Sequence, residues 1–139
     1  MEGTGETVAS PASAVWSPDR WVRFQDEVRR RALQARPEAP AWLVIARAAR
    51  RVMATYTTSF YLVSRFLPLQ KRRRVEVIYA AVRYPDEVVD SFPFPPEERK
   101  ALLDRWRGDF EHALAMDSLE QMLRSGISPF VAAFTVLTR

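Results

Sequence analysis

The chain has 139 residues, of which 47% are hydrophobic and 27% charged, a balance that predicts a soluble globular domain rather than a disordered or collagen-like chain. It contains no cysteine and one histidine, His112, which excludes disulfides and thiolate metal sites and leaves little material for a three-histidine zinc site or a Ser-His-Asp triad. The net charge of +4 permits attraction to phosphates or to an anionic membrane surface without requiring either.

We predict neither a secretion signal nor a membrane span from this sequence. There is no run of about 18 apolar residues, and the N-terminus has no apolar signal core. We therefore predict a cytoplasmic protein, and peripheral contact with a membrane stays open.

The first fifteen residues are rich in Gly, Ser, Thr, Ala and Pro and have no apolar period, so residues 1–15 are predicted to be a disordered tail. Residues 16–139 then form one domain. Ser17, Pro18 and Asp19 supply an N-cap, a first-turn proline and a dipole-matched acid, and they predict a helix that runs to about Ala35. Its apolar stripe consists of Trp21, Phe24, Val28 and Leu33.

The next predicted element is long and apolar. Residues 40–68 have helical period with a β-branched interruption, so we expect two helical pieces with a bend near Thr57. After a turn at Pro68 and Leu69, a helix is predicted over residues 70–92. Its apolar side is predicted to consist of Val75, Ile78, Tyr79 and Val82.

Three more helices complete the prediction. A proline pair followed by acids starts a helix over residues 93–115, and a shorter amphipathic piece covers residues 118–126. Ser128 is the predicted cap and Pro129 the first residue of the last helix. The core stripe of the first of these helices consists of Leu102, Leu103, Trp106, Phe110 and Ala113. The sequence shows no strand pattern, no internal repeat and no glycine-rich phosphate loop. We therefore predict an all-α fold.

The sequence RYPDEVVD, residues 83–90, gives the clearest indication of chemistry. On a helix, Tyr79, Arg83, Asp86 and Asp90 are separated by four, three and four residues, so all four project from one side. Two carboxylates one turn apart can hold Mg²⁺, which fills its other positions with water and phosphate oxygens. An arginine one turn earlier can bind the same phosphate group.

The alternative for this motif is a pair of solvated acids, which is the usual role of such a spacing. Two observations favour a site. No lysine or arginine follows Asp86 or Asp90 within helical reach to pair with them, and Tyr79, Val82 and Val89 predict apolar packing beside them.

Two other segments have competing interpretations. Taken alone, the stretch from Ser59 to Phe66 favours core packing of Phe60, Tyr61 and Phe66, whereas a functional interpretation makes Phe60 the wall of a ligand tunnel. The basic run Lys71–Arg74 lies at a helix N-terminus, where cations oppose the macrodipole. A solvated turn or contact with anionic lipid is favoured over nucleic-acid binding, because no interleaved aromatic residues or second basic face accompany the run.

Residues 59–90, SFYLVSRFLPLQKRRRVEVIYAAVRYPDEVVD, resemble the first signature of the squalene/phytoene synthase family, all-α enzymes that join two isoprenoid diphosphates head to head. The match runs without a gap from Ser-Phe through Leu-Pro, a turn arginine, Tyr-Ala and an arginine to Asp-x-x-x-Asp, and weaker similarity continues to the end of the chain. The resemblance implies the N-terminal part of an isoprenoid-synthase-type helical bundle. It is greatest to bacterial phytoene synthases, which implies condensation of two geranylgeranyl diphosphates, with a squalene-type synthase as the alternative.

The resemblance also implies roles for individual residues. Asp86 and Asp90 would bind Mg²⁺ that bridges to the substrate diphosphate, and Glu87 stands where the family usually has a second Asp. Arg83 and Tyr79 match diphosphate-side residues. Ser59 and Phe60 match residues that line the substrate pocket near the reacting carbons.

Two features depart from the family pattern. No second Asp-x-x-x-Asp follows Asp90, so the chain is expected to be truncated and inactive alone unless a companion chain supplies that motif. Pro85 stands where a small residue is usual, and within a helix it costs about 3 kcal/mol unless the helix kinks. Pro85→Ala is therefore expected to raise stability.

A different class of function fits the same sequence. The chain can be a non-catalytic helical module that binds a partner chain or an isoprenoid through a face left uncovered, with Phe130 and Phe134 among the exposed core residues. The partner predicted first is a prenyl diphosphate, and no nucleic acid is expected.

Overall fold

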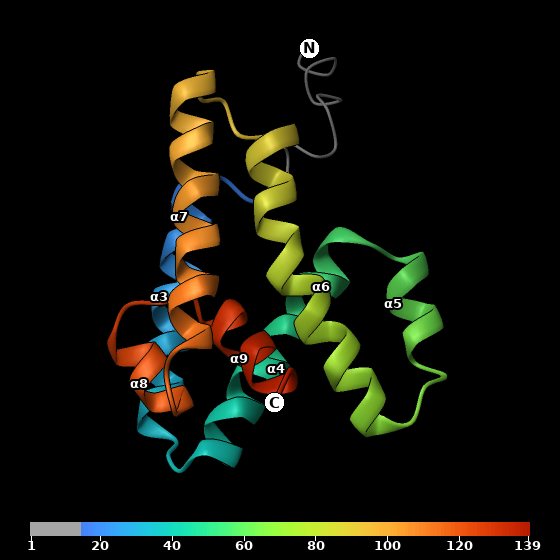
Figure 1. Ribbon diagram of the computed structural model, residues 1–139. Helices are drawn as coiled ribbons and strands as arrows, with labels where there is room; N and C mark the ends of the chain where they lie inside the picture. The colour runs from blue at the N-terminus through green and yellow to red at the C-terminus, as the bar shows by residue number, and fades with distance from the viewer. Residues whose placement is uncertain (1–14) are drawn as a thin grey trace.

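The computed structural model describes residues 15–139, so the predicted tail lies outside the described residues except for Val15. The described part contains seven helices and no strand, which confirms the all-α class (Figure 1). The helices are α3 (Pro18–Gln34), α4 (Glu38–Tyr56), α5 (Ser59–Ser64), α6 (Leu69–Asp90), α7 (Pro96–Leu114), α8 (Leu119–Arg124) and α9 (Pro129–Leu137).

Of the two predicted serine caps, one makes the side-chain hydrogen bond of a cap. The Ser17 hydroxyl accepts a hydrogen bond from the Arg20 N–H at 3.1 Å and opens α3. Ser128 precedes α9 as predicted, but its hydroxyl does not cap the helix. Instead it donates to Oε1 of Gln25 at 2.5 Å and ties the start of α9 to α3.

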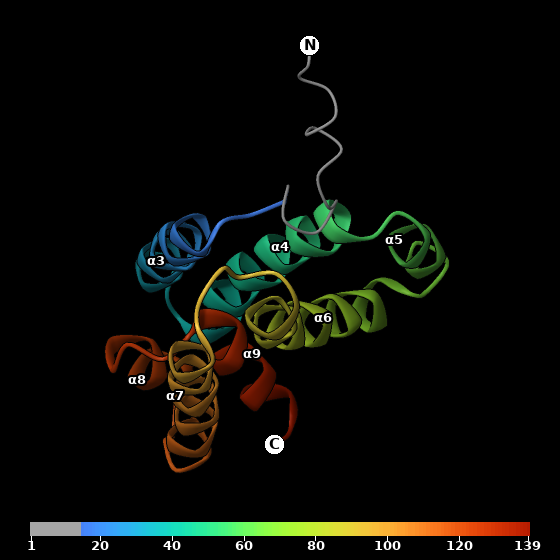
Figure 2. The ribbon, with the colours of Figure 1, turned by 90° about the horizontal axis from the view of Figure 1, so that it is seen from above.

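Helix α9 lies at the centre of the molecule, between α4 and α6 on one side and α7 and α8 on the other (Figure 2). Six of its nine residues are buried. The expectation that Phe130 and Phe134 are uncovered is therefore wrong: Phe130 is 1% exposed, and Phe134 is partly buried with its ring stacked 5.7 Å from that of Phe110. The surrounding helices already enclose this apolar segment.

The bend predicted near Thr57 is present. Thr57 has extended backbone angles, φ −146° and ψ 130°, so α4 ends at Tyr56 and α5 starts at Ser59. Helix α5 lies at the outer edge of the molecule, against the end of α4 (Figure 2). The guanidinium of Arg72 donates to the carbonyl oxygens of Arg65 and Leu67, at 2.9 and 3.2 Å, and thereby holds the turn between α5 and α6.

Pro85 lies inside α6, as predicted. A proline has no N–H, so the carbonyl four residues earlier, that of Ala81, loses its helical donor. The indole N–H of Trp106 on α7 donates to this oxygen at 3.1 Å. A side chain from the neighbouring helix thus satisfies the acceptor that the proline leaves free, which is what a buried carbonyl requires.

Candidate functional site

Helix α6 has a buried side and an exposed side, and the predicted apolar side is partly wrong. Ile78 and Val82 are 42% and 47% exposed. The buried side consists of Glu76, Val77, Ala80, Ala81, Glu87 and Val88. Small alanines let α6 lie close to its neighbours, and two ion-paired glutamates are buried with them, so side-chain hydrophobicity alone pointed to the wrong face.

The four motif residues differ in exposure. Tyr79 is half-buried, and the side chain of Arg83 is 22% exposed, whereas that of Asp86 is 61% exposed and Asp90 is also exposed. The two aspartates lie one turn apart on the same helix, which places their carboxylates at the solvent side of α6.

The structure brings one residue of the preceding segment to this motif. The ring of Phe60 lies 5.9 Å from the ring of Tyr79, and Phe60 is 47% exposed. Core packing therefore does not describe Phe60, nor Phe66, which is 89% exposed. Ser59 is exposed at the first position of α5.

Arg83 is the centre of the polar contacts. Its Nε donates to Oε2 of Glu87 at 3.1 Å, its terminal nitrogen pairs with the same carboxylate, and a second terminal nitrogen lies 3.6 Å from Oδ2 of Asp86. The guanidinium also lies 4.8 Å from the ring centre of Tyr56, whose hydroxyl accepts from the Trp21 indole at 3.0 Å. The prediction that Asp86 lacks a compensating cation is therefore wrong, because its partner precedes it by one turn.

Glu87 does not share the surface of the two aspartates. It is fully buried, and its Oε2 takes both hydrogen bonds from Arg83. Its other oxygen, Oε1, has no hydrogen-bond partner within residues 15–139. Glu87 is therefore placed to hold the Arg83 guanidinium from the interior rather than to face a metal beside Asp86.

Burial and charge fix the ionisation of the two residues that precede the acids. Burial raises the pKa of Tyr79, and the positive charge of Arg83 offsets part of this rise. Burial alone would lower the pKa of Arg83, but the hydrogen bonds and charge of Glu87 raise it on balance. Tyr79 is thus a neutral phenol that can donate a hydrogen bond, and Arg83 is a cation, a combination suited to an anionic ligand.

The acids fit a shared magnesium site only in part. Residues 15–139 contain no cluster of three or more His, Cys, Asp or Glu side chains that could hold a metal ion. Mg²⁺, however, is commonly held by one or two carboxylates, with waters and substrate phosphates as its other ligands. Asp86 and Asp90 match that requirement, and the buried Glu87 does not.

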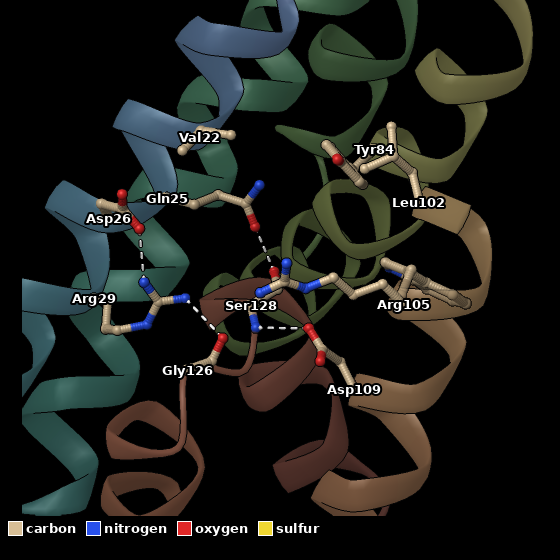
Figure 3. A pocket seen from close by; sticks show the side chains of 11 residues that line it. Val22, Gln25, Asp26, Arg29, Tyr84, Leu102, Arg105, Asp109, Gly126 and Ser128 are labelled. Atoms are coloured by element: carbon tan, nitrogen blue, oxygen red, sulfur yellow. Dashed lines mark hydrogen bonds and ion pairs between the residues drawn. The ribbon is translucent and has the colours of Figure 1, made fainter. Parts of the chain in front are cut away.

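A cavity of about 210 Å³ lies away from these residues, between α3, α7 and the chain before α9 (Figure 3). Tyr84 lines it from α6, but Tyr79, Arg83, Asp86 and Asp90 do not. Polar groups along its wall are engaged in cross-links: Arg29 donates to the carbonyls of Gly126 and Ile127, at 3.2 and 3.1 Å. The cavity is therefore separate from the candidate site, which lies on an open helix face.

A second buried ion pair, which the sequence did not indicate, also involves α6. Glu76 is 2% exposed and pairs with Arg65, whose guanidinium lies 4.5 Å from the ring centre of Tyr61. Burial raises the pKa of Glu76, and the neighbouring arginines oppose that rise. The Arg83–Glu87 spacing of four residues was visible in the sequence, whereas Arg65 and Glu76 lie on different elements and gave no local signal.

None of the described helices is long and apolar enough to cross a membrane. That finding concerns residues 15–139 only.

Comparison with known proteins gives a consistent result. Residues 53–139 match the family model described as squalene/phytoene synthase. Phytoene synthase of Arthrospira platensis is 34% identical over 71 residues, which cover 51% of this chain and 23% of that protein. Presqualene diphosphate synthase of Zymomonas mobilis is 38% identical over 58 residues, which cover 42% of this chain and 20% of that protein.

The matched segments thus span less than a quarter of either relative. No solved structure gives a significant match. The matched family is the one that residues 59–90 indicated, which confirms the resemblance.

Proposed function

Since the chain belongs to the squalene/phytoene synthase family, we propose that the exposed side of α6 is the diphosphate-binding half of a head-to-head prenyltransferase site. The observation that carries this proposal is the pair of exposed carboxylates, Asp86 and Asp90, one helical turn apart beside the Arg83 cation. The substrate proposed first is geranylgeranyl diphosphate, giving phytoene. Farnesyl diphosphate, the substrate of a squalene-type synthase, is the alternative.

Each residue has a distinct proposed role. Asp86 and Asp90 would hold Mg²⁺, which when bound stabilises the negative charge on a departing diphosphate. Arg83 would bind diphosphate oxygens directly, and the Tyr79 hydroxyl would donate a further hydrogen bond. Glu87 would keep Arg83 oriented through the two hydrogen bonds that it accepts.

The prenyl tail requires an apolar surface next to the diphosphate. Phe60 packs on Tyr79, and Val82 is exposed one turn from Tyr79 and Asp86 on α6. We propose that Phe60 and Val82 contact the first isoprene units, with Ser59 at the edge of this surface.

Binding can be tested without turnover. Titration of the 139-residue chain with geranylgeranyl diphosphate, with and without Mg²⁺, should show binding that the metal strengthens. Asp86→Asn should weaken the magnesium-dependent binding on the order of tenfold, because a charged contact to the metal is lost. Asp104→Asn is the matched control: its side chain is 58% exposed on α7, against 61% for Asp86.

The chain carries a single Asp-x-x-x-Asp motif. We propose that a complete catalytic centre needs a second acidic helix, from further residues of the polypeptide or from a companion chain. The 139 residues alone should then show no steady release of diphosphate with Mg²⁺ and labelled geranylgeranyl diphosphate. Turnover that Asp86→Asn abolishes would overturn this part of the proposal.

A non-catalytic isoprenoid- or partner-binding module is the second candidate. It is favoured by the exposed Ile78, Val82 and Val89 on α6, which offer an apolar surface even without a metal. This candidate predicts that the prenyl diphosphate binds equally with and without Mg²⁺, and that Asp86→Asn leaves its affinity unchanged.

A further inference from the structure

Charge is distributed unevenly along the chain. Residues 39–85 contain nine lysines and arginines against one acid, Glu76, whereas the other residues contain twelve against sixteen. The segment therefore carries a net charge of +8, and the remainder carries −4. Glu76 is buried and paired with Arg65, so it adds no negative charge to the surface of this segment.

The same segment exposes apolar side chains at the edge of the molecule. We refer to Leu62, Val63, Phe66 and Leu69 as the apolar tip. Each of these side chains is more than half exposed, and Phe66 is 89% exposed. Helix α5, which begins this stretch, lies at the rim of the molecule, away from α3, α7 and α8 (Figure 2).

The basic run Lys71–Arg74 follows the tip directly. Lys71 and Arg74 are exposed, and Arg72 fixes the tip to α6 through its hydrogen bonds to the carbonyls of Arg65 and Leu67. Cations in the first turn of a helix oppose the helix dipole, so local helix stability does not account for this run. Arg72 thus holds the turn that carries Phe66 against the start of α6, so exposed apolar and cationic side chains lie close along the chain in one surface segment.

Such a surface matches the boundary of a membrane. Apolar side chains gain free energy by entering the acyl region, while adjacent lysines and arginines bind the phosphates of anionic headgroups. A nucleic acid would satisfy the cations but offers no apolar environment for Leu62, Val63 and Leu69. We propose that the apolar tip and the basic run dock this protein on an anionic lipid surface.

This proposal does not rest on the proposed catalytic function, because neither Asp86 nor Asp90 takes part in it. It can be tested by flotation of the full 139-residue chain with vesicles of phosphatidylcholine and with vesicles that also contain phosphatidylglycerol. The chain should float with the anionic vesicles, and added salt should release it.

Four variants separate the two parts of the surface. Leu69→Ser and Phe66→Ser should each lower the partition coefficient about tenfold, the scale of a buried apolar side chain. Arg74→Gln should lower it about fivefold, the scale of one basic residue near an anionic surface. Lys71→Gln should act as Arg74→Gln does.

Matched controls lie on α7. Leu114 is 53% exposed, against 51% for Leu69, and the side chain of Arg107 is 76% exposed. Leu114→Ser and Arg107→Gln should leave the partition coefficient unchanged. Circular dichroism and thermal unfolding verify that every variant is folded.

Several outcomes would overturn the proposal. One is failure of the chain to bind anionic vesicles. Another is a fall in the partition coefficient that is equal for the variants of the tip and the control variants of α7. Affinity for a DNA duplex that falls with Arg74→Gln but not with Phe66→Ser, without vesicle binding, would assign the surface to nucleic acid. A dimer in sedimentation velocity that Leu69→Ser dissociates would assign the tip to a second copy of the chain.

Discussion

Helices α9 and α5 are both short and apolar, yet the fold treats them in opposite ways. Six of the nine residues of α9 are buried, whereas the buried residue of α5 is Ser64, a polar one. Helices α4, α6, α7 and α8 surround α9, while α5 rests on the end of α4, where the Ser64 hydroxyl lies 3.6 Å from the Met53 sulfur. Apolar composition therefore did not decide burial; the number of neighbours did. The region around α9 is a closed core, and the α5–α6 region is a surface that exposes apolar side chains.

The largest expected difference in stability between the two regions comes from substituting one phenylalanine in each. Phe130→Ala should lower the free energy of unfolding by about 3 to 5 kcal/mol, because it opens a cavity in the centre of the core. Phe66→Ala should change it by less than about 0.5 kcal/mol, since that ring is 89% exposed. Urea unfolding followed by circular dichroism measures both.

Similar losses of stability in the two variants would contradict this prediction. If Phe66→Ala cost as much as Phe130→Ala, the α5 region would be packed in solution and the contrast between the two helices would fail. Should Phe130→Ala not fold at all, Phe130→Leu keeps the comparison measurable with a smaller cavity.

The next test concerns the ion pair that anchors the candidate site to the core. Arg83→Met leaves Glu87 charged and fully buried, so it should cost about 3 kcal/mol of stability. Arg107→Met breaks an exposed pair with Glu111 on α7 and should cost less than about 1 kcal/mol. Thermal or urea unfolding compares the two.

A double variant identifies the cause. Adding Glu87→Leu to Arg83→Met removes the uncompensated charge and should restore most of the lost stability. If the double variant were no more stable than Arg83→Met, lost packing against Tyr56 rather than a buried charge would explain the effect.

Much of the fold was predictable from local signals. The cap at Ser17, the bend at Thr57 and the proline-led starts of α7 and α9 depend on neighbouring residues, so the sequence located them. Local signals did not indicate which helix lies at the centre of the molecule. The burial of Phe130 depends on α4, α6, α7 and α8 closing around it, and for that reason the predicted exposed face was assigned to the wrong helix.

The candidate site shows the same division. The spacing of Tyr79, Arg83, Asp86 and Asp90 placed them correctly along α6, and the family resemblance drew attention to them. The burial of Glu87 beside the exposed Asp86 was not predicted, because a charged residue is buried only where a partner compensates it. The metal role of the aspartates stays a prediction.

The smallest change in stability is expected at the contact between α6 and α7, where Pro85 of α6 lies near Trp106 of α7. Pro85→Ala should raise the free energy of unfolding by about 1 to 2 kcal/mol, since the new N–H completes the helix and the Trp106 bond had already offset part of the cost of the proline.

Trp106→Phe should cost about 1 kcal/mol when Pro85 is present, because the Ala81 carbonyl then loses its donor. In the Pro85→Ala background the same change should cost less, because the new backbone N–H of α6 can donate to that carbonyl. A double-mutant cycle in urea measures the difference between the two costs. Equal costs in both backgrounds would mean that Trp106 stabilises the junction by ring packing alone, and the proline would then need another explanation.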